Sequence, residues 1–297
     1  MNDVSQLLNR AESLVAKLEA LLPAEPAPTD WKASIAFRWR KHHGRTTHGA
    51  LQPVTQVHRI QLADLRGIDE QKALVEQNTR QFVEGHPANN VLLTGARGTG
   101  KSSLIKALLT KYAPRGLRLI EVEKQDLIDL PDIVELICKR PERYVLYCDD
   151  LSFEADEPGY KALKVILDGS IAAASDNCLI YATSNRRHLM PEFMNENLEY
   201  KHVGEEIHPG ETSEEKVSLS ERFGLWVSFY PFDQDEYLHI VGVWLAHFKV
   251  TDIRSDEVKH AALQWSLQRG SRSGRVAWQF ARDWAGRKRL SAVKRKK

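Results

Sequence analysis

The chain has 297 residues, of which 42% are hydrophobic and 28% charged, a composition typical of a soluble globular protein. No apolar run approaches the roughly 20 residues of a membrane helix, and the first thirty residues lack a basic segment followed by an apolar one. Its three cysteines show no paired spacing. These patterns predict a cytoplasmic protein with no membrane partner, no zinc site and no disulfide framework.

The formal net charge is +2, but the charges are segregated along the chain. Residues 31–60 hold six Lys or Arg, four His and no acid, and residues 287–297 hold seven Lys or Arg and no acid. Residues 192–215 contain eight acids and one lysine. The basic tail predicts either binding to nucleic acid or an acidic partner, or a purely solubilising role. The acidic segment, within residues 191–216, predicts either a partner-contacting insertion or a solvated loop.

Residues 1–61 are expected to form an N-terminal extension. Leucines at helical spacing predict a helix over residues 4–22, and three prolines between residues 23 and 28 predict a stiff linker. Residues 31–60 mix tryptophan and phenylalanine with arginine, a composition that suits single-stranded nucleic acid and suits a packed N-terminal arm equally well. We assign no secondary structure to this stretch.

Short apolar runs alternate with helical patterns over residues 62–231. This alternation predicts a parallel sheet with helices on both faces, an αβα sandwich. Strands are expected at 91–94, 117–122, 144–148, 178–183 and 226–230, and helices at 65–84 (after a turn at Gly67), 101–112, 131–139 and 159–167. Capping signals at Asp233, Ser255 and Ser273 then predict a small three-helix unit within residues 232–285, followed by the basic tail 286–297.

A phosphate-binding loop follows the strand predicted at 91–94. Residues 95–102 match the pattern G-x-x-x-x-G-K-[ST], with a strand before the loop and a helix after it. Backbone N–H groups of such a loop wrap a phosphate chain; Lys101 would reach the β- and γ-phosphates, and Ser102 would bind Mg²⁺. The predicted ATP-binding residues of this loop are Gly95, Ala96, Arg97, Gly98, Thr99, Gly100, Lys101, Ser102 and Ser103.

Polar side chains follow two of the other predicted strands. Asp149 and Asp150 end the strand at 144–148, and Asn185 follows the strand at 178–183. Parallel sheets bind ligands at the carboxyl ends of their strands, so Asp149 is expected in the Mg²⁺ shell and Asp150 as the group that polarises the attacking water. Asn185 would hold that water. Solvated acids and a turn-forming asparagine are the alternative interpretation.

This ordered set resembles the AAA+ ATPases, a P-loop family whose sheet domain carries a helical lid. Lys101, Asp149 and Asn185 match the Walker A lysine, the Walker B aspartate and sensor 1 of that family. The resemblance covers roughly residues 62–284. It implies ATP and Mg²⁺ as cofactors. It also implies a homo-oligomeric ring, which in this family is usually a hexamer.

Three further residues carry roles that only the resemblance implies. Arg222, in the segment 218–223, resembles the arginine finger that acts on the ATP of a neighbouring subunit. Arg275 is the better match to the sensor 2 arginine, with Arg272 second, and a surface charge is the alternative for either. Ile68, in the segment 65–69, would contact adenine. In this setting the acidic segment 191–216 could also position the finger.

More narrowly, residues 148–154, 182–189 and 272–280 look like a bacterial AAA+ family known only as domain of unknown function 815. One departure from the superfamily is Asp150, where most AAA+ hydrolases carry glutamate. The shorter side chain places its carboxylate about 1.5 Å further from the water, judging by C–C bond lengths, and so predicts slow hydrolysis.

The expected function is therefore an oligomeric AAA+ ATPase that binds and slowly hydrolyses Mg-ATP to remodel a protein or nucleic-acid complex. The alternative is an ATP-gated switch or adaptor in which binding, not turnover, controls assembly. A monomeric P-loop enzyme such as a small-molecule kinase is a third and weaker interpretation. The sequence names neither the client nor the number of subunits.

Overall fold

The computed structural model describes residues 10–15, 28–41, 49–153, 157–168, 176–186, 189, 201–203, 206–208, 219–253 and 255–294. Residues 10–15 are helical, and the rest of the helix expected over 4–22 lies outside the described residues, as do most of the proline linker and most of the acidic segment 191–216. No helix in the described parts of the chain is long and apolar enough to cross a bilayer.

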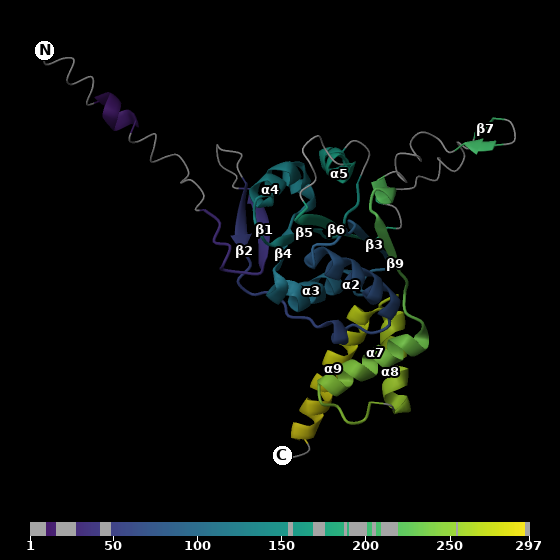
Figure 1. The fold of residues 1–297 in the computed structure, drawn as a ribbon. Coiled ribbons are helices and arrows are strands. Elements are labelled where there is room, and N and C mark those ends of the chain that lie inside the picture. The colour runs from purple at the N-terminus through teal and green to yellow at the C-terminus, as the bar shows by residue number, and fades with distance from the viewer. Residues whose placement is uncertain are drawn as a thin grey trace, which may run out of the picture.

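The centre of the protein is a seven-stranded sheet with the order β2-β1-β4-β5-β6-β3-β9 (Figure 1). All neighbouring strands in it are parallel except β1 and β2, which are antiparallel. A separate antiparallel hairpin pairs β7 (Lys201–Val203) with β8 (Glu206–His208). The strands of the large sheet are β1 (Ala36–Lys41), β2 (Gly49–Pro53), β3 (Val91–Gly95), β4 (Leu117–Glu121), β5 (Arg143–Cys148), β6 (Cys178–Ser184) and β9 (Leu225–Phe229).

Helices cover both faces of this sheet, which confirms the predicted αβα arrangement. On one face lie α2 (Asp69–Val83) and α3 (Lys101–Tyr112), and on the other lie α4 (Leu130–Ile137) and α5 (Pro158–Asp168) (Figure 1). Successive strand residues point to opposite faces, so Leu93 packs in one apolar cluster and Leu92 in the other. Burial on both faces explains why the central strands are continuous apolar runs. Short 3-10 turns complete the layers: η1 (Leu62–Asp64), η2 (Ala113–Arg115) and η3 (Lys124–Asp129).

The sheet extends across the boundary that the sequence suggested at residue 61. β1 pairs with β4, and β2 pairs with β1, so these two strands extend the sheet at this edge. The apolar residues Phe37 and Trp39 of β1 are buried. Arg38 forms an ion pair with Glu121, the last residue of β4, and Arg40 forms one with Glu123, two residues later. The described strands 36–41 and 49–53 are therefore a packed part of the fold, and the alternation of apolar and basic residues over 36–41 is itself a strand signal.

Three helices follow β9: α7 (Gln234–His247), α8 (Asp256–Gln268) and α9 (Gly274–Lys294). Their starts are where the capping signals predicted them. The Asp233 carboxylate accepts a hydrogen bond from the Glu236 N–H, and the Ser255 hydroxyl accepts one from the Val258 N–H. α9 is longer than expected and continues through residues 286–294 of the predicted basic tail.

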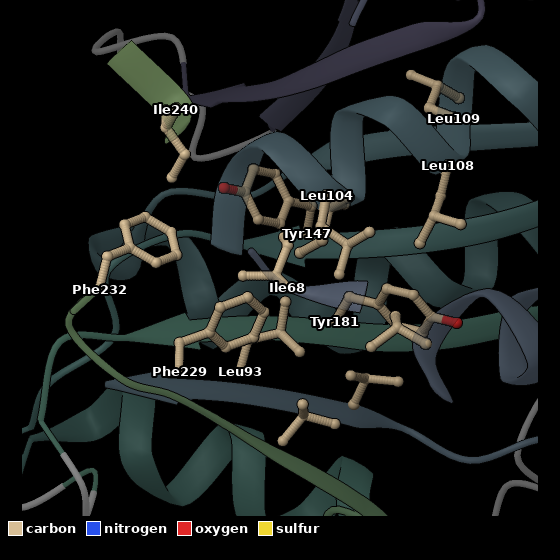
Figure 2. Packing of buried hydrophobic residues seen from close by; sticks show 14 of the residues in the cluster. Ile68, Leu93, Leu104, Leu108, Leu109, Tyr147, Tyr181, Phe229, Phe232 and Ile240 are labelled. Atoms are coloured by element: carbon tan, nitrogen blue, oxygen red, sulfur yellow. The ribbon is translucent and has the colours of Figure 1, made fainter. Parts of the chain in front are cut away.

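The helical unit shares its apolar core with one face of the sheet. Phe232 and Ile240 belong to the same cluster as Leu104 and Phe229 (Figure 2). This shared packing holds the start of α9 beside the loop between β3 and α3, which is where the candidate site lies.

Candidate nucleotide-binding site

The loop between β3 and α3 has a backbone that only glycine adopts without strain. Gly95, Gly98 and Gly100 have φ values of 118°, 76° and 106°. A Cβ at Gly95 would lie 1.9 Å from the Phe229 carbonyl oxygen, which also accepts a hydrogen bond of 3.1 Å from the Ala96 N–H. The glycine spacing seen in the sequence thus serves both the turn and the close approach of β9.

Lys101, the first residue of α3, is almost fully buried, with 6% of its surface exposed. Its ammonium donates hydrogen bonds to the carbonyl oxygens of Gly95 (2.7 Å) and Ala96 (2.8 Å) and to Asn185 Oδ1 (3.1 Å). Burial lowers the pKa of Lys101 to about 8, although Asp150 and Asp149 act in the opposite direction. All three hydrogen-bond partners are neutral oxygens, so the charge of the ammonium remains available to an anion such as a phosphate group.

Asp149 lies at the end of β5, beside the P-loop. Its Oδ1 accepts hydrogen bonds from Ser102 Oγ (2.8 Å) and Thr183 Oγ1 (2.6 Å). Burial raises the pKa of Asp149, but the hydrogen bonds to its carboxylate outweigh that effect and hold the pKa below its usual value. An ionised carboxylate beside a serine hydroxyl is an oxygen donor set of the kind that Mg²⁺ prefers.

Thr183 was not among the residues predicted for the site. It is buried in β6 and also accepts a hydrogen bond of 2.9 Å from the Asp150 N–H, so it ties the ends of β5 and β6 together. Its position two residues before Asn185, at the carboxyl end of a predicted strand, was a signal that could have identified it.

Asp150 adopts a left-handed backbone conformation with φ of 52°, which aspartate tolerates better than most residues. Its carboxylate accepts a hydrogen bond from the side-chain amide of Asn185, and its Oδ2 lies 3.6 Å from the guanidinium of Arg97. The structure therefore brings together the predicted base, the predicted water-holding asparagine and a P-loop arginine.

The start of α9 lies against the P-loop. The Arg275 N–H points to the Gly98 carbonyl oxygen at 3.4 Å, and a Cβ at Gly98 would lie 2.9 Å from Ser273 Oγ. The exposed Arg275 also lowers the pKa of Lys101, after the larger effects of burial, the two aspartates and Arg97. Arg272 instead offers its carbonyl oxygen to the Phe232 N–H at 3.3 Å. Of the two arginines predicted for this region, Arg275 is the one in contact with the loop.

Ile68, predicted to contact adenine, is 4% exposed and precedes α2. Its Cδ1 lies 3.3 Å from the position of a Cβ at Gly100, so the side chain packs beneath the P-loop. Next to it, a cleft of about 380 Å³ separates the segment around Gly67 from α7. A larger hollow of about 590 Å³ lies between η3 and α5 and is lined by none of the predicted site residues.

Arg222 lies away from the P-loop of its own chain. It precedes β9, whereas the P-loop meets the other end of that strand, where Gly95 is paired with Phe229. The five residues of β9 span about 17 Å at the usual rise per residue. The Arg222 guanidinium forms an ion pair with Asp168, the last residue of α5.

Comparisons with known proteins agree with this architecture. The model of the family described as "Protein of unknown function (DUF815)" matches residues 32–288. No curated protein matches the chain.

Among solved structures, the match to a mutant of Thermotoga maritima RuvB covers 80% of this chain and 68% of the RuvB chain, at 16% identity and a TM-score of 0.50. The match to a second variant of the same RuvB covers 79% of this chain and 66% of that RuvB chain, at 15% identity and a TM-score of 0.49. The match to the replication initiator DnaA bound to AMPPCP and single-stranded DNA covers 75% of this chain and 64% of the DnaA chain, at 17% identity and a TM-score of 0.47. The chain thus spans about two thirds of the length of these structures. It belongs to the DUF815 family, and its fold is that of the AAA+ P-loop ATPases.

Proposed function

We propose that this protein is an AAA+ ATPase that binds Mg-ATP and hydrolyses it slowly to remodel a protein or nucleic-acid complex. The observation that carries the proposal is the convergence of three groups at the carboxyl ends of the adjacent strands β5, β6 and β3. These groups are the Lys101 ammonium, the hydrogen-bonded pair of Ser102 and Asp149, and the linked side chains of Asp150 and Asn185.

Each group has a role in phosphate chemistry. The P-loop N–H groups and Lys101 would bind the phosphates, with the N-terminus of α3 adding positive potential. Ser102 and Asp149 would hold Mg²⁺, which neutralises charge on the phosphate oxygens when it is bound. Asp150 would accept a proton from the attacking water, and Asn185 would orient that water beside the terminal phosphate.

The state of Asp150 supports slow turnover. Its carboxylate is engaged by Asn185 and faces Arg97, so it must exchange these contacts before it can activate a water. Aspartate is also shorter than the glutamate that most AAA+ hydrolases carry here, and misplacement of about 1 Å can lower a rate about a hundredfold. These features also favour the second candidate function, a switch in which nucleotide binding sets assembly.

The adenine base would occupy the cleft beside Ile68, between the segment around Gly67 and α7. Arg275, on α9, would contact the phosphates from the other side of the P-loop. A nucleotide in that position would bridge the sheet domain and the helical unit, so its loss would change how the two pack together.

We also propose that the protein acts as a homo-oligomeric ring. A hexamer is the expected form, because AAA+ proteins commonly assemble as hexamers. The distance of Arg222 from the P-loop of its own chain supports action on a neighbouring subunit. The RuvB of Thermotoga maritima is described as a Holliday junction branch migration motor, and the DnaA structure contains single-stranded DNA. A shared fold does not assign a client, and Arg38 and Arg40 are engaged within this chain's own fold. The proposal therefore keeps both a protein and a nucleic acid as clients.

The test measures binding and turnover on the same samples. A fluorescent ATP analogue should bind with Mg²⁺, phosphate should be released slowly, and light scattering should show assembly with nucleotide. Lys101→Met should abolish binding. Unchanged affinity in Lys101→Met would remove the site assignment, whereas binding and assembly without phosphate release would favour the switch.

A further inference from the structure

Thr183 holds the chain where it leaves β5. The last residue pair between β5 and β6 joins Cys148 to Ala182. Thr183 is the next residue of β6, and only 2% of its surface is exposed. Its carbonyl oxygen accepts a hydrogen bond of 2.7 Å from the Leu151 N–H. The chain that follows β5 therefore stays tied to β6 beyond the last strand pair.

The hydroxyl of Thr183 contacts both of the residues that lie between. It donates to Asp149 Oδ1 at 2.6 Å and accepts from the Asp150 N–H at 2.9 Å. A hydroxyl carries one donor and two acceptor positions, so it can make both bonds at once. An ionised carboxylate only accepts and a backbone N–H only donates, so the two bonds fix the direction of the hydroxyl. One buried side chain thus contacts the proposed metal-binding carboxylate and the backbone of the proposed base.

Packing alone does not require a hydroxyl at this position. Valine has the shape of threonine, suits a buried strand as well, and avoids the cost of burying a polar group. The branched Cβ restricts χ1 of Thr183, so the backbone of β6 determines where the hydroxyl lies. Asp150 has a φ of 52°, and a non-glycine residue keeps such a conformation only when its surroundings hold it there. The bond from its N–H to Thr183 is one of those constraints.

We propose that Thr183 is a positioning residue that orients Asp149 and Asp150 together, an inference that rests on the proposed Mg-ATP site. The bond that it donates holds the Asp149 carboxylate in the orientation that the metal site requires. The bond that it accepts holds the turn that carries the Asp150 carboxylate. Ser102 also donates to Asp149 Oδ1, but from the P-loop, whereas Thr183 acts from a central strand of the sheet.

The test compares Thr183→Val, which removes the hydroxyl, with Thr183→Ser, which keeps it. The first quantity is the Mg²⁺ concentration that half-restores tight binding of a fluorescent ADP analogue, with affinity in EDTA as the reference. Thr183→Val should raise that concentration about tenfold and leave the EDTA affinity unchanged, since lost outer-shell contacts cost about 10- to 100-fold in metal affinity. Thr183→Ser should stay close to the wild type.

The second quantity is turnover at saturating Mg²⁺ and ATP, which reports on Asp150 separately from metal affinity. Thr183→Val should lower this rate about tenfold, less than the roughly hundredfold loss that a 1 Å misplacement can cause, because the Leu151 N–H still bonds to the backbone of β6. Thr183→Ser should restore the rate.

A second buried threonine of the same protein provides the matched control. Thr79, on α2, is 0% exposed, and its hydroxyl donates to the Val75 carbonyl oxygen at 2.7 Å and lies 2.9 Å from the Tyr181 hydroxyl. Thr79→Val should lower the melting temperature and leave both the Mg²⁺ requirement and the saturated rate unchanged. If Thr183 were merely structural, the two valine variants would behave alike.

If Thr183→Val does not fold, Thr183→Ser and Thr183→Ala make the same comparison. These two variants differ by a single oxygen atom, and both have lost the threonine methyl group. The alanine variant should need more Mg²⁺ and turn over more slowly than the serine variant.

Three outcomes would overturn the inference. The first is a variant without the hydroxyl whose Mg²⁺ requirement or saturated rate equals that of its partner with the hydroxyl, while the wild type shows Mg²⁺-dependent binding; the nucleotide site itself would then stand. The second is an equal rise of the Mg²⁺ requirement in Thr79→Val, which would show a general loosening of the core. The third is a wild type that binds no nucleotide at any Mg²⁺ concentration, which would remove the proposed function as well.

Discussion

The ammonium of Lys101 lies 3.1 Å from the side-chain oxygen of Asn185, 84 positions later in the chain. This contact joins the P-loop to the residue that follows β6 by one position. The amide of Asn185 in turn donates to Asp150 at the end of β5. The lysine, the amide and the carboxylate therefore form one connected group, and a ligand that draws Lys101 away would also change the contacts of Asp150.

The first prediction concerns pH. Burial lowers the pKa of Lys101 from 10.5 to about 8, so the folded protein loses this proton at a lower pH than the unfolded chain does. Between about pH 8 and 10.5 the unfolded chain holds more protons, and stability rises with pH by up to about 1.4 kcal/mol per unit. The cost of burying the charge is fully present below pH 8 and is relieved above it.

Lys101→Met isolates this effect, because other titrating groups cancel in the comparison. Urea denaturation of the nucleotide-free proteins should show the wild type gaining stability relative to Lys101→Met from about pH 8 to 10.5. Well below that range the difference in unfolding free energy should be constant. A difference that stays flat at every pH would contradict the lowered pKa.

The second prediction concerns Asp150. Asp150→Asn keeps a residue that tolerates the left-handed backbone but removes the proton acceptor, so it should lower phosphate release about a hundredfold and leave nucleotide affinity nearly unchanged. Asp150→Ala should lower the rate similarly and also lower the unfolding free energy by about 1 kcal/mol, because alanine is strained at φ of 52°. An unaltered rate in Asp150→Asn would assign the base to another residue.

The third prediction separates a finger acting between subunits from a structural arginine. Arg222→Ala should lose most ATPase activity, and Lys101→Met should lose it as well. If Arg222 acts on a neighbour, mixing the two inactive variants should recover activity, because mixed interfaces pair an intact P-loop with an intact Arg222. Asp168→Asn serves as the control for the ion pair with Arg222. A mixture that stays inactive while it assembles would contradict action between subunits.

The fourth prediction concerns the contact between the P-loop and α9. Gly98→Ala should destabilise the protein by about 1–2 kcal/mol from its left-handed backbone, with a further cost because the new Cβ would lie 2.9 Å from Ser273 Oγ. Ser273→Gly removes that hydroxyl at a cost of only a few tenths of a kcal/mol for the helix cap. The double variant should therefore be more stable than the sum of the single effects, as measured by urea denaturation; strict additivity would show that the two elements are not in contact.

The fifth prediction tests whether the edge strands belong to the fold. Trp39 is 2% exposed, and its indole N–H donates to Asp129 at 2.9 Å. Trp39→Ala should lower the unfolding free energy by about 3–5 kcal/mol. Leu74→Ala, at a position 50% exposed, should change it by less than about 0.5 kcal/mol. Equal small effects would mean that β1 is a detachable extension.

Much of the architecture could be predicted from the sequence because its signals are local. The P-loop is defined by glycines that the backbone needs within six residues, and each central strand is an apolar run because it is buried on both faces. The helix starts at Asp233, Ser255 and Ser273 follow from side chains that cap their own backbone. β1 and Thr183 were missed although their signals were present, in the alternation of residues 36–41 and the position before Asn185.

Other features depend on contacts between distant parts of the chain, and only the tertiary structure decided them. Nothing near Arg222 in the sequence indicates that Asp168 is its partner, and nothing near Arg275 or Arg272 shows which of them meets Gly98. Spacing along the chain determines which backbone turns and strands form, whereas the pairing of side chains depends on the order in which the sheet brings those strands together.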